Sequence, residues 1–252
     1  MKLDTVLFDM GGTLEEIKYV ADAQAFLPKR LEQVLGLEGS QLTRMDIHAC
    51  YARLKHNYAS YRAFREETCV EVHPAMVWRD WILKDFTIAD DVIFDHCEEL
   101  AHVWETEVIT RRTRDGIEQM LDALARRDIH MGVISNTGSF TQVHESLKQY
   151  GIKSYFEVIV LSSELGIRKP HPYVFHHALK SMQRDALRSM YVGDTISRDV
   201  IGARNAGLLK TVQIASEFTK LSDDASTGGY RPDYVIHSLM DLVPIIDEIN
   251  ET

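Results

Sequence analysis

The chain has little of what marks a secreted, membrane or nucleic-acid-binding protein. It contains only 3 cysteines in 252 residues, without CxxC spacing, which favours free thiols in a reducing compartment over a disulfide framework. No apolar run approaches the roughly 18–20 residues that a membrane span requires. The short apolar run near the N-terminus is interrupted by an aspartate before a signal-peptide core could form. We therefore expect a cytoplasmic protein.

Positive charge is also scarce. Lys and Arg together number 28 against 38 Asp and Glu, which gives a formal net charge of −10. Such a surface repels nucleic acid and anionic lipid, and no clustered basic stripe offsets it. We expect neither a nucleic-acid partner nor a membrane partner. A phosphorylated substrate would need a local positive site, made by a cation or by a few placed Lys and Arg side chains.

What the chain does have is a series of short apolar runs that end abruptly in polar residues or glycine. Such runs are typical of strands buried on both faces of a parallel sheet, and segments with helical periodicity alternate with them. This alternation predicts an α/β fold, a doubly wound parallel sheet with a Rossmann-like core, which binds ligands at the carboxyl ends of its strands. The expected strands are 5–8, 131–134, 156–161, 190–192 and 210–214, and the expected helices include 116–127, 141–150 and 173–182.

The segment 15–110 has a different character. It contains no strand-like run, and its aromatic and apolar residues recur at helical spacing. We therefore predict an all-helical cap domain at 15–110, inserted into an α/β core formed by residues 1–14 and 111–252. In this cap, Arg62 and Arg65 could bind a distal anion of the substrate or lie on a solvated helix face.

Four polar clusters follow expected strands and would meet at one edge of the sheet. Asp9 precedes Gly11 and Gly12, where backbone N–H groups can turn toward an anion. Hard oxygen ligands drawn from two strand ends suit Mg²⁺, which keeps water molecules that a phosphate can replace. The other clusters contain Asp194 and Asp199, then Lys169, which supplies a point charge, and then Ser135 with Asn136.

These parts are consistent with phosphoryl transfer. Asp9 would attack phosphorus, the cation and Lys169 would spread the charge, and Ser135 would hold an equatorial oxygen. An anionic nucleophile and an anionic substrate repel each other, and at ~4 Å and an effective dielectric of ~20 each pair of unit charges is worth ~4 kcal/mol. A divalent cation and a lysine are needed to offset this repulsion.

At this point the chain resembles the haloacid dehalogenase superfamily. One DxxxT match would be weak, but four ordered motifs, each ending a strand, cover the core, and the inserted helices look like the family's helical cap. The resembling residues are Phe8 to Leu14, Ile134-Ser135-Asn136, Lys169-Pro170, and Gly193-Asp194 through Asp199.

The resemblance implies a role for each matching residue. Asp9 would be the nucleophile and a metal ligand, and Lys169 would orient it. The metal would also bind the backbone carbonyl of Gly11 and Asp194, with Asp199 as a direct or water-mediated neighbour. The phosphoryl group would be held by Ser135, Asn136, Lys169 and the backbone at Gly12.

One departure from the family pattern limits this prediction. Phosphatases of the family usually carry a second Asp two residues after the nucleophile, which protonates the leaving group, and here that position is Gly11. General acid–base help is typically worth ~10²–10⁴-fold. Either the leaving group needs no proton, or Glu15, Glu16 or His171 supplies one, or the protein is a catalytically weak relative that only binds phosphate ligands.

We predict a magnesium-dependent hydrolase of a small phosphorylated metabolite that forms an aspartyl-phosphate on Asp9. A 2-haloacid dehalogenase-like hydrolase with an Asp9 ester is an alternative, because that branch also lacks the second Asp. The dehalogenase branch does not keep the Gly-Asp-x4-Asp motif, which this chain has at 193–199, so phosphate chemistry is favoured. Neither the natural substrate nor the oligomeric state follows from the sequence.

Overall fold

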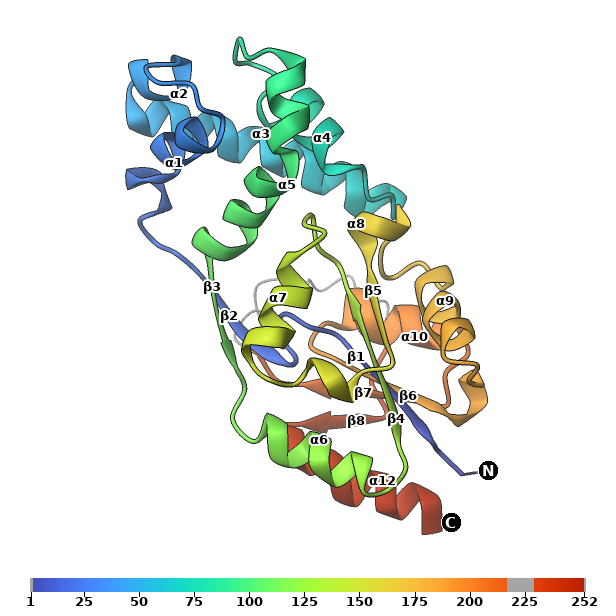
Figure 1. Cartoon of the computed structure of the whole chain (residues 1–252). Helices are drawn as coiled ribbons and strands as arrows, with labels where there is room; N and C mark the ends of the chain where they lie inside the picture. Colours follow the sequence, from blue (N-terminus) through green and yellow to red (C-terminus); the bar gives the residue numbers. More distant parts are fainter. Residues whose placement is uncertain (1, 217–228, 252) are drawn as a thin grey trace.

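Six parallel strands form the central sheet in the computed structural model, which describes residues 2–216 and 229–251. Their order is β5-β4-β1-β6-β7-β8 (Figure 1). The predicted doubly wound α/β fold is confirmed, and a strand overlaps each of the five expected apolar runs. The strands are β1 (Thr5–Phe8), β4 (His130–Ser135), β5 (Val158–Leu161), β6 (Ser189–Gly193), β7 (Lys210–Ile214) and an unexpected edge strand, β8 (Tyr234–Ile236).

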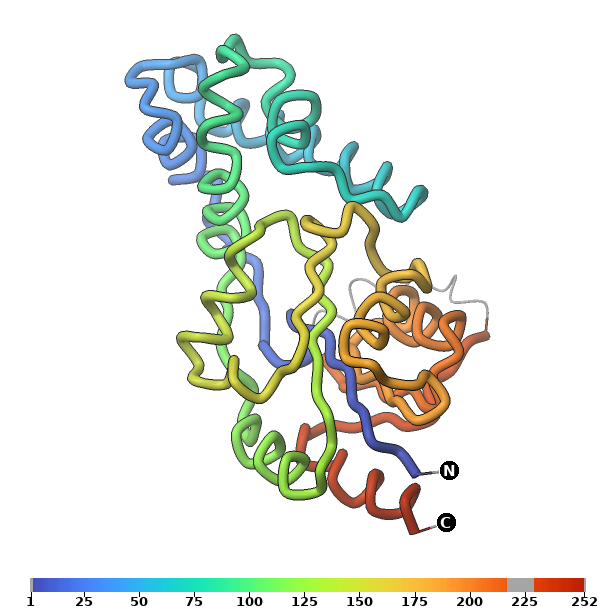
Figure 2. Tube along the Cα trace, turned by 45° about the vertical axis from the view of Figure 1, so that its right-hand side comes forward, coloured from blue at the N-terminus to red at the C-terminus, as the bar shows by residue number. Residues whose placement is uncertain are grey.

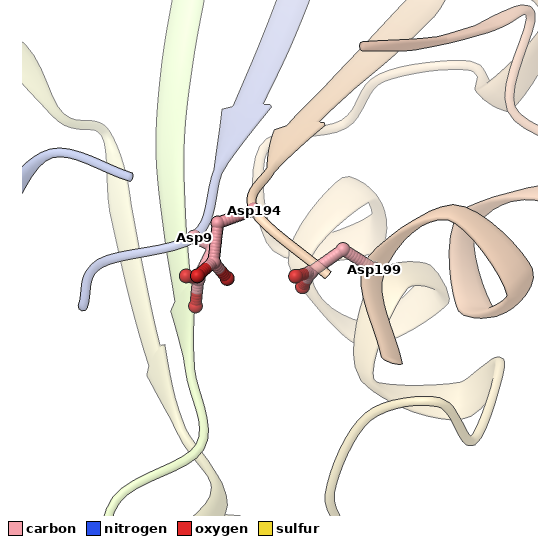
Figure 3. A group of neighbouring side chains, drawn as sticks. All are labelled: Asp9, Asp194 and Asp199. Atoms are coloured by element: carbon pink, nitrogen blue, oxygen red, sulfur yellow. The ribbon is translucent and has the colours of Figure 1, made fainter. Parts of the chain in front are cut away.

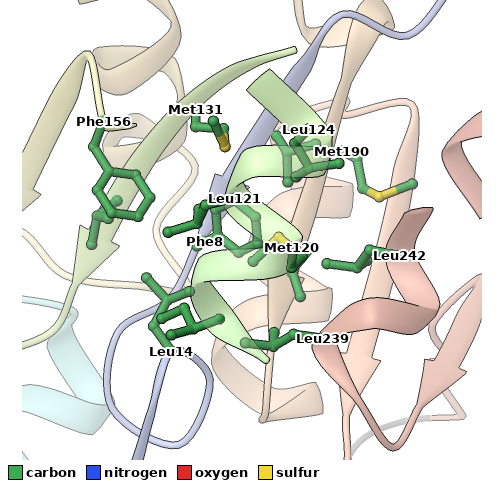
Figure 4. Packing of buried hydrophobic residues seen from close by; sticks show 14 of the residues in the cluster. Phe8, Leu14, Met120, Leu121, Leu124, Met131, Phe156, Met190, Leu239 and Leu242 are labelled. Carbon is green, nitrogen blue, oxygen red and sulfur yellow. The ribbon is translucent and has the colours of Figure 1, made fainter. Parts of the chain in front are cut away.

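Helices cover both faces of this sheet, because alternate side chains of the buried strands point to opposite sides. Val6 and Phe8 of β1 pack in the same cluster as α6 (Ile117–Ala125), α7 (Gln142–Gln149) and α12 (Leu242–Glu251), as Figure 4 shows for part of it. Leu7 packs on the other face. That face is covered by α9 (Tyr173–Ser181) and α10 (Ile201–Asn205), and the remaining short core helices are α8 (Ser162–Leu165), η3 (Lys153–Tyr155), η4 (Ala186–Arg188), η5 (Ile196–Val200) and η6 (Leu239–Asp241).

The inserted segment forms a helical cap with a hydrophobic cluster of its own. Trp78 and Trp104 meet edge to face, with ring centroids 6.0 Å apart, and Leu54 and Leu100 are fully buried around them. Figures 1 and 2 show this cap beside the edge of the sheet at which β1 ends. Its helices are η1 (Ala23–Ala25), α1 (Leu27–Val34), α2 (Gln41–Arg44), α3 (Ile47–Thr68), α4 (Pro74–Met76), the π-helical turn η2 (Val77–Ile82) and α5 (Asp90–Glu107).

The expectation that residues 15–110 are entirely helical is wrong at both ends. Strand β2 (Glu15–Tyr19) pairs antiparallel with β3 (Ile109–Thr113), so the two connections between core and cap form a ribbon, seen side by side in Figures 1 and 2. The sequence of β2 has no apolar run because the strand is only partly buried. Its hydrogen bonds come from a partner about 95 residues away, which local periodicity does not reveal.

Within the described residues, no helix combines the length and the apolar character that crossing a bilayer requires.

The core cluster should tolerate loss of volume poorly. Phe8 is fully buried and meets Phe156 edge to face at 6.3 Å. We expect Phe8→Ala to lower the free energy of unfolding by about 3–5 kcal/mol, because it removes buried apolar surface and leaves a cavity. Phe94→Ala in the cap is the control, since Phe94 is 42% exposed and should cost about 1 kcal/mol or less. Urea denaturation measures both, and equal losses would contradict the prediction.

Candidate active site

The strand order brings the predicted site residues to one edge of the sheet. Strand β1 lies between β4 and β6 with all three parallel. Asp9 follows β1, Ser135 is the last residue of β4, and Asp194 follows β6. All three are buried. The carboxyl ends of adjacent parallel strands are where doubly wound folds bind ligands, so the predicted cluster is assembled in space.

Lys169 joins the carboxylates of this cluster. Its Nζ donates to Asp9 Oδ1 at 2.6 Å, to Asp199 Oδ1 at 2.7 Å and to the Tyr191 hydroxyl at 2.7 Å. The lysine side chain is 2% exposed, so its three N–H groups are all used inside the protein. The geometry suits a cation that orients Asp9 and neutralises part of the acidic cluster.

Asp9, Asp194 and Asp199 form a group able to hold a metal ion. Each offers a carboxylate oxygen, and these oxygens all lie within 4.8 Å of one another (Figure 3). Asp199 is held in place because its Oδ2 accepts from the amide and the hydroxyl of Thr195 at 3.0 and 2.6 Å. Several buried hard oxygens at this spacing fit Mg²⁺ better than a softer transition metal.

The electrostatics of the three carboxylates differ. Burial, and then the charges of Asp9 and Asp199, raise the pKa of Asp194 to about 7. Burial also raises the pKa of Asp9, although Lys169 opposes this. The pKa of Asp199 is lowered, because Lys169 and Arg198 outweigh the effect of its burial. Three carboxylates thus face two cations, Lys169 and Arg198, and this imbalance favours a bound metal cation.

Two glycines allow the loops to approach this closely. A Cβ at Gly12, where φ is +92°, would lie 2.3 Å from Asp194 Oδ2. A Cβ at Gly193 would lie 2.4 Å from Cβ and Cγ of Asp199. Both distances are far below van der Waals contact. These glycines are required for the carboxylates to converge, which is a structural reason for the motifs in which they occur.

Asn136 has a contact that the sequence did not predict. Its side-chain amide donates to the carbonyl of Lys169 at 3.0 Å, and its Oδ1 accepts from the amide of Lys169 at 2.9 Å. This pair of bonds fixes the backbone of Lys169 against the end of β4. Ser135 lines the same cavity as Asp9. The structure thus brings Ser135 and Asp9 to one cavity.

Arg111 of the ribbon approaches the position of the missing acid. A Cβ built on Gly11 would lie 3.4 Å from Arg111 Nη1 and 3.6 Å from Ile17 Cδ1. A side chain at position 11 would thus meet a guanidinium at ordinary contact distance. Arg111 also binds Glu15 at 2.8 Å and Glu105 at 2.6 Å.

The three candidate substitutes for this acid are placed unfavourably. Glu15 is fully buried, and its two oxygens accept from Arg111 and from the Tyr150 hydroxyl. Glu16 binds Arg112 on the outer side of the ribbon, with Nε 2.8 Å from Oε2. His171 is exposed, and its Nδ1 accepts from a backbone amide two residues along the chain. None of these three residues lines the cavity that contains Asp9.

This cavity lies between the strand ends, the ribbon and the cap. Core residues supply the reactive end, and aromatic and charged residues of the cap and ribbon supply the rest. Glu105 is the acidic residue of the cap in its lining. The lining residues are Asp9, Gly11, Ile17, Tyr19, Tyr58, Arg65, Glu105, Ile109, Arg111, Ser135, Asn136, Thr137, Gln142, Arg168, Lys169 and Arg198.

Sequence reasoning missed three residues that contact the charged cluster or lie near it. Tyr191 lies inside a predicted strand, where it looked like ordinary core, yet its hydroxyl binds Lys169. Thr13 donates to Asp9 Oδ2 at 3.1 Å, and its place in the DxxxT pattern was the available signal. Arg198 lies between the two aspartates of the last motif, and their negative charges raise its pKa although burial opposes this.

Comparison with known proteins agrees with this geometry. The family model for haloacid dehalogenase-like hydrolases matches residues 3–207. A pyrophosphatase named PpaX from Bacillus mycoides (strain KBAB4) is 25% identical over 251 residues, which cover 99% of this chain and 100% of the relative.

Solved structures share the fold along nearly the whole chain. A 2-haloacid dehalogenase from Pseudomonas syringae pv. Tomato DC3000 aligns with a TM-score of 0.65 and 21% identity, covering 98% of both chains. The putative HAD-hydrolase YfnB from Bacillus subtilis, bound to magnesium, aligns with a TM-score of 0.57 and 20% identity over 98% of this chain and 100% of that chain. The sequence match, supported by the common fold, establishes that the chain belongs to the haloacid dehalogenase-like hydrolases.

Proposed function

We propose that the protein is a magnesium-dependent phosphatase that forms an aspartyl-phosphate on Asp9 and acts on a small phosphorylated metabolite. The observation that carries this proposal is the buried cluster in which Lys169 binds both Asp9 and Asp199, with Asp194 beside them. A hydrolase with this arrangement has a positioned carboxylate nucleophile and a set of oxygen ligands for a cation.

The chemistry assigned to the protein's own residues has two displacements. An oxygen of Asp9 forms a bond to phosphorus, and the bond between phosphorus and the leaving oxygen breaks with its electron pair on that oxygen. Lys169 holds Asp9 in one orientation and offsets the charge that gathers there. Ser135 donates to an equatorial oxygen. Water then attacks phosphorus, the bond between phosphorus and the Asp9 oxygen breaks with its electron pair on Asp9, and inorganic phosphate leaves with the protons of the water.

The residues that would hold magnesium are Asp9, Asp194, Asp199 and the carbonyl of Gly11. When bound, the ion supplies positive charge that lets an anionic substrate approach an anionic nucleophile. Support for magnesium comes from the three converging carboxylates and from a structural neighbour that carries it. The same carboxylates favour phosphate chemistry over carbon–halogen chemistry, because an alkyl halide needs no dication beside the nucleophile.

The name of a relative indicates a class of substrate for this chain but not one compound. PpaX is named a pyrophosphatase, so a small phosphorylated compound is the class we assign to this chain. We place the protein's action on such compounds in the cytoplasm, in line with its cysteine usage.

Asp9→Asn tests the nucleophile. We expect a fall in kcat of at least about 10³-fold with p-nitrophenyl phosphate or acetyl phosphate in the presence of Mg²⁺, because an amide is a poor nucleophile. The control is Asp4→Asn, at the other end of β1 and away from the cavity, which should keep normal turnover. Circular dichroism checks that both variants are folded. Normal hydrolysis by Asp9→Asn would refute the mechanism.

Two further outcomes separate the competing functions. If wild type hydrolyses neither compound yet binds inorganic phosphate, the protein is a phosphate-binding relative without useful activity. If it releases halide from 2-haloacids without magnesium, the dehalogenase chemistry is correct. Either outcome would overturn the phosphatase proposal.

Asp194→Asn tests the metal site through stability. Without metal at pH 8, Asp194 adds a third negative charge to the cluster, so its neutralisation should raise Tm by roughly 3–6 °C. With saturating Mg²⁺ the order should reverse, because wild type gains binding energy that the variant lacks. Thermal denaturation with and without Mg²⁺ measures both effects. An equal magnesium-induced shift in the two proteins would exclude Asp194 as a ligand.

The metal-free effect should depend on pH with a definite sign. The folded pKa of Asp194, about 7, lies above its ordinary value of 3.8, so the folded state binds the proton more tightly than the unfolded state does. Wild type therefore loses stability as pH rises toward and through 7. The Tm advantage of Asp194→Asn should be small at pH 5 and largest at pH 8. An advantage that does not change with pH would contradict this titration.

Gly11→Asp tests whether the missing acid limits the enzyme. Position 11 has room for a side chain, since the nearest atoms lie 3.4–3.7 Å from a Cβ there. We expect a gain of about tenfold or more on an alkyl phosphate, whose leaving group needs a proton, and little change on p-nitrophenyl phosphate. Gly11→Ala controls for the backbone change and should show no gain. If Gly11→Asp is no faster than Gly11→Ala on alkyl phosphates, proton donation is not what limits the enzyme.

A further inference from the structure

Two arginines at the cap side of the cavity share a single carboxylate. Arg65 belongs to the cap helix α3, Arg168 precedes Lys169 in the core, and both line the cavity that contains Asp9. Arg168 Nη1 lies 3.0 Å from Glu71 Oε2, and Arg65 Nη1 lies 3.5 Å from Glu71 Oε1. The remaining bonds of Glu71 come from the neutral hydroxyls of Tyr61 and Ser162. Two positive charges therefore face one negative charge.

Both guanidinium groups have N–H donors left over. In the part of the chain that the structure describes, Arg168 donates through Nη1 alone, although it is only 3% exposed. Arg65 donates to Glu71 and, at 2.9 Å, to the Tyr58 hydroxyl, while its Nε is buried without a hydrogen-bond partner. Buried donors without acceptors are costly. Both arginines line the cavity, where an anionic group could accept from their unused donors.

The surrounding charges do not remove the excess at Arg168. Burial, and then the like charge of Arg65, lower the pKa of Arg168 to about 10 even though Glu71 is in contact with it. The charge of Arg198 acts in the same direction. Glu105, the other carboxylate on the cap side, accepts hydrogen bonds from Arg111 and from the amide of Gly138.

The neighbouring cap arginine shows that this placement is particular to Arg65. Arg62 lies three residues earlier on α3, and its side chain is 43% exposed. It pairs with Glu66 at 2.7 Å on the solvent side of the helix, and it does not line the cavity. Of the two cap arginines that the sequence offered for a distal anion, one faces the site and the other is an ordinary surface residue.

We infer that Arg65 and Arg168 form a second anion site, which binds a phosphate or carboxylate group at the far end of the substrate while Asp9 attacks its phosphoryl group. The inference rests on the proposed phosphatase function and narrows it to substrates that carry a negative group at both ends. A planar guanidinium binds either group through two parallel hydrogen bonds.

The kinetic test compares substrates that differ in the charge of their tail, which is the end away from the phosphoryl group that Asp9 attacks. Inorganic pyrophosphate has a phosphate tail, 2-phosphoglycolate has a carboxylate tail, and p-nitrophenyl phosphate has an uncharged one. We expect Arg65→Gln to lower the ratio of kcat/KM on the better charged-tail substrate to that on p-nitrophenyl phosphate by roughly 10–100-fold, mainly through KM. Arg62→Gln should leave the ratio unchanged. The larger fall in kcat/KM, on pyrophosphate or on 2-phosphoglycolate, shows whether the site prefers a phosphate or a carboxylate.

A binding experiment gives a readout that needs no turnover. Methylenediphosphonate carries two anionic groups joined by a P–C–P bridge, which has no P–O bond for a phosphatase to cleave. Methylphosphonate carries one anionic group. Calorimetry in Mg²⁺ should show Arg65→Gln weakening the diphosphonate at least tenfold more than the monophosphonate. Arg65→Lys, which keeps a charge opposite Glu71, should recover part of the loss and controls for a folding defect.

The outcomes separate the two proposals. If wild type hydrolyses p-nitrophenyl phosphate but Arg65→Gln affects all substrates and ligands equally, the second anion site is wrong and the phosphatase stands. If no phosphate compound is hydrolysed but Arg65→Gln selectively loses the diphosphonate, the site stands and the phosphatase function fails. A wild type that binds diphosphonate no better than methylphosphonate overturns the inference outright.

Discussion

The contact on which the active site depends is the one between the Lys169 ammonium and two buried carboxylates. Asp9, Asp199 and Asp194 lie close enough together to repel one another, and burial strengthens this repulsion. Lys169 lies within 2.7 Å of Asp9 and Asp199, and its charge lowers the pKa of both against the effect of their burial. Removing one partner of such a buried pair typically costs about 3–5 kcal/mol. The lysine therefore holds the acidic cluster together and fixes the side chain of Asp9, the proposed nucleophile.

The rest of the fold brings the three carboxylates to within 4.8 Å of one another. The placement of β1 between β4 and β6 sets Asp9 beside the strand ends that carry Ser135 and Asp194. Asn136 then binds both backbone polar groups of Lys169, which ties the lysine to the end of β4. Gly12 and Gly193 supply the close approach, because a methyl group at either would overlap a carboxylate.

The sequence predicts the core better than the cap. Buried parallel strands are near-continuous apolar runs, so five of the six strands of the sheet and the polar residues that end them could be located. Strand β2 could not, because it is a strand only by pairing with β3 far along the chain. The same limit applies to side-chain partners. Asn136 matched a motif, but its contact with Lys169 depends on where two loops meet in space. Arg62 and Arg65 were indistinguishable until the orientation of α3 was known.

The glycine at position 11 and the arginines at the cap side are consistent with one kind of substrate. A leaving group that is itself a phosphate has a second pKa of about 6, so it departs as a stable anion without receiving a proton. A carboxylate-bearing alcohol would need the proton that Gly11 cannot supply. Arg65 and Arg168 would hold a terminal phosphate, and Arg111 Nη1 lies 3.4 Å from the place of a Cβ at position 11. A substrate in which two phosphates share a bridging oxygen therefore makes the missing acid unnecessary, because the group that leaves is a phosphate, and its second phosphate can use the cationic end of the cavity. One chemical feature thus accounts for both Gly11 and the paired arginines.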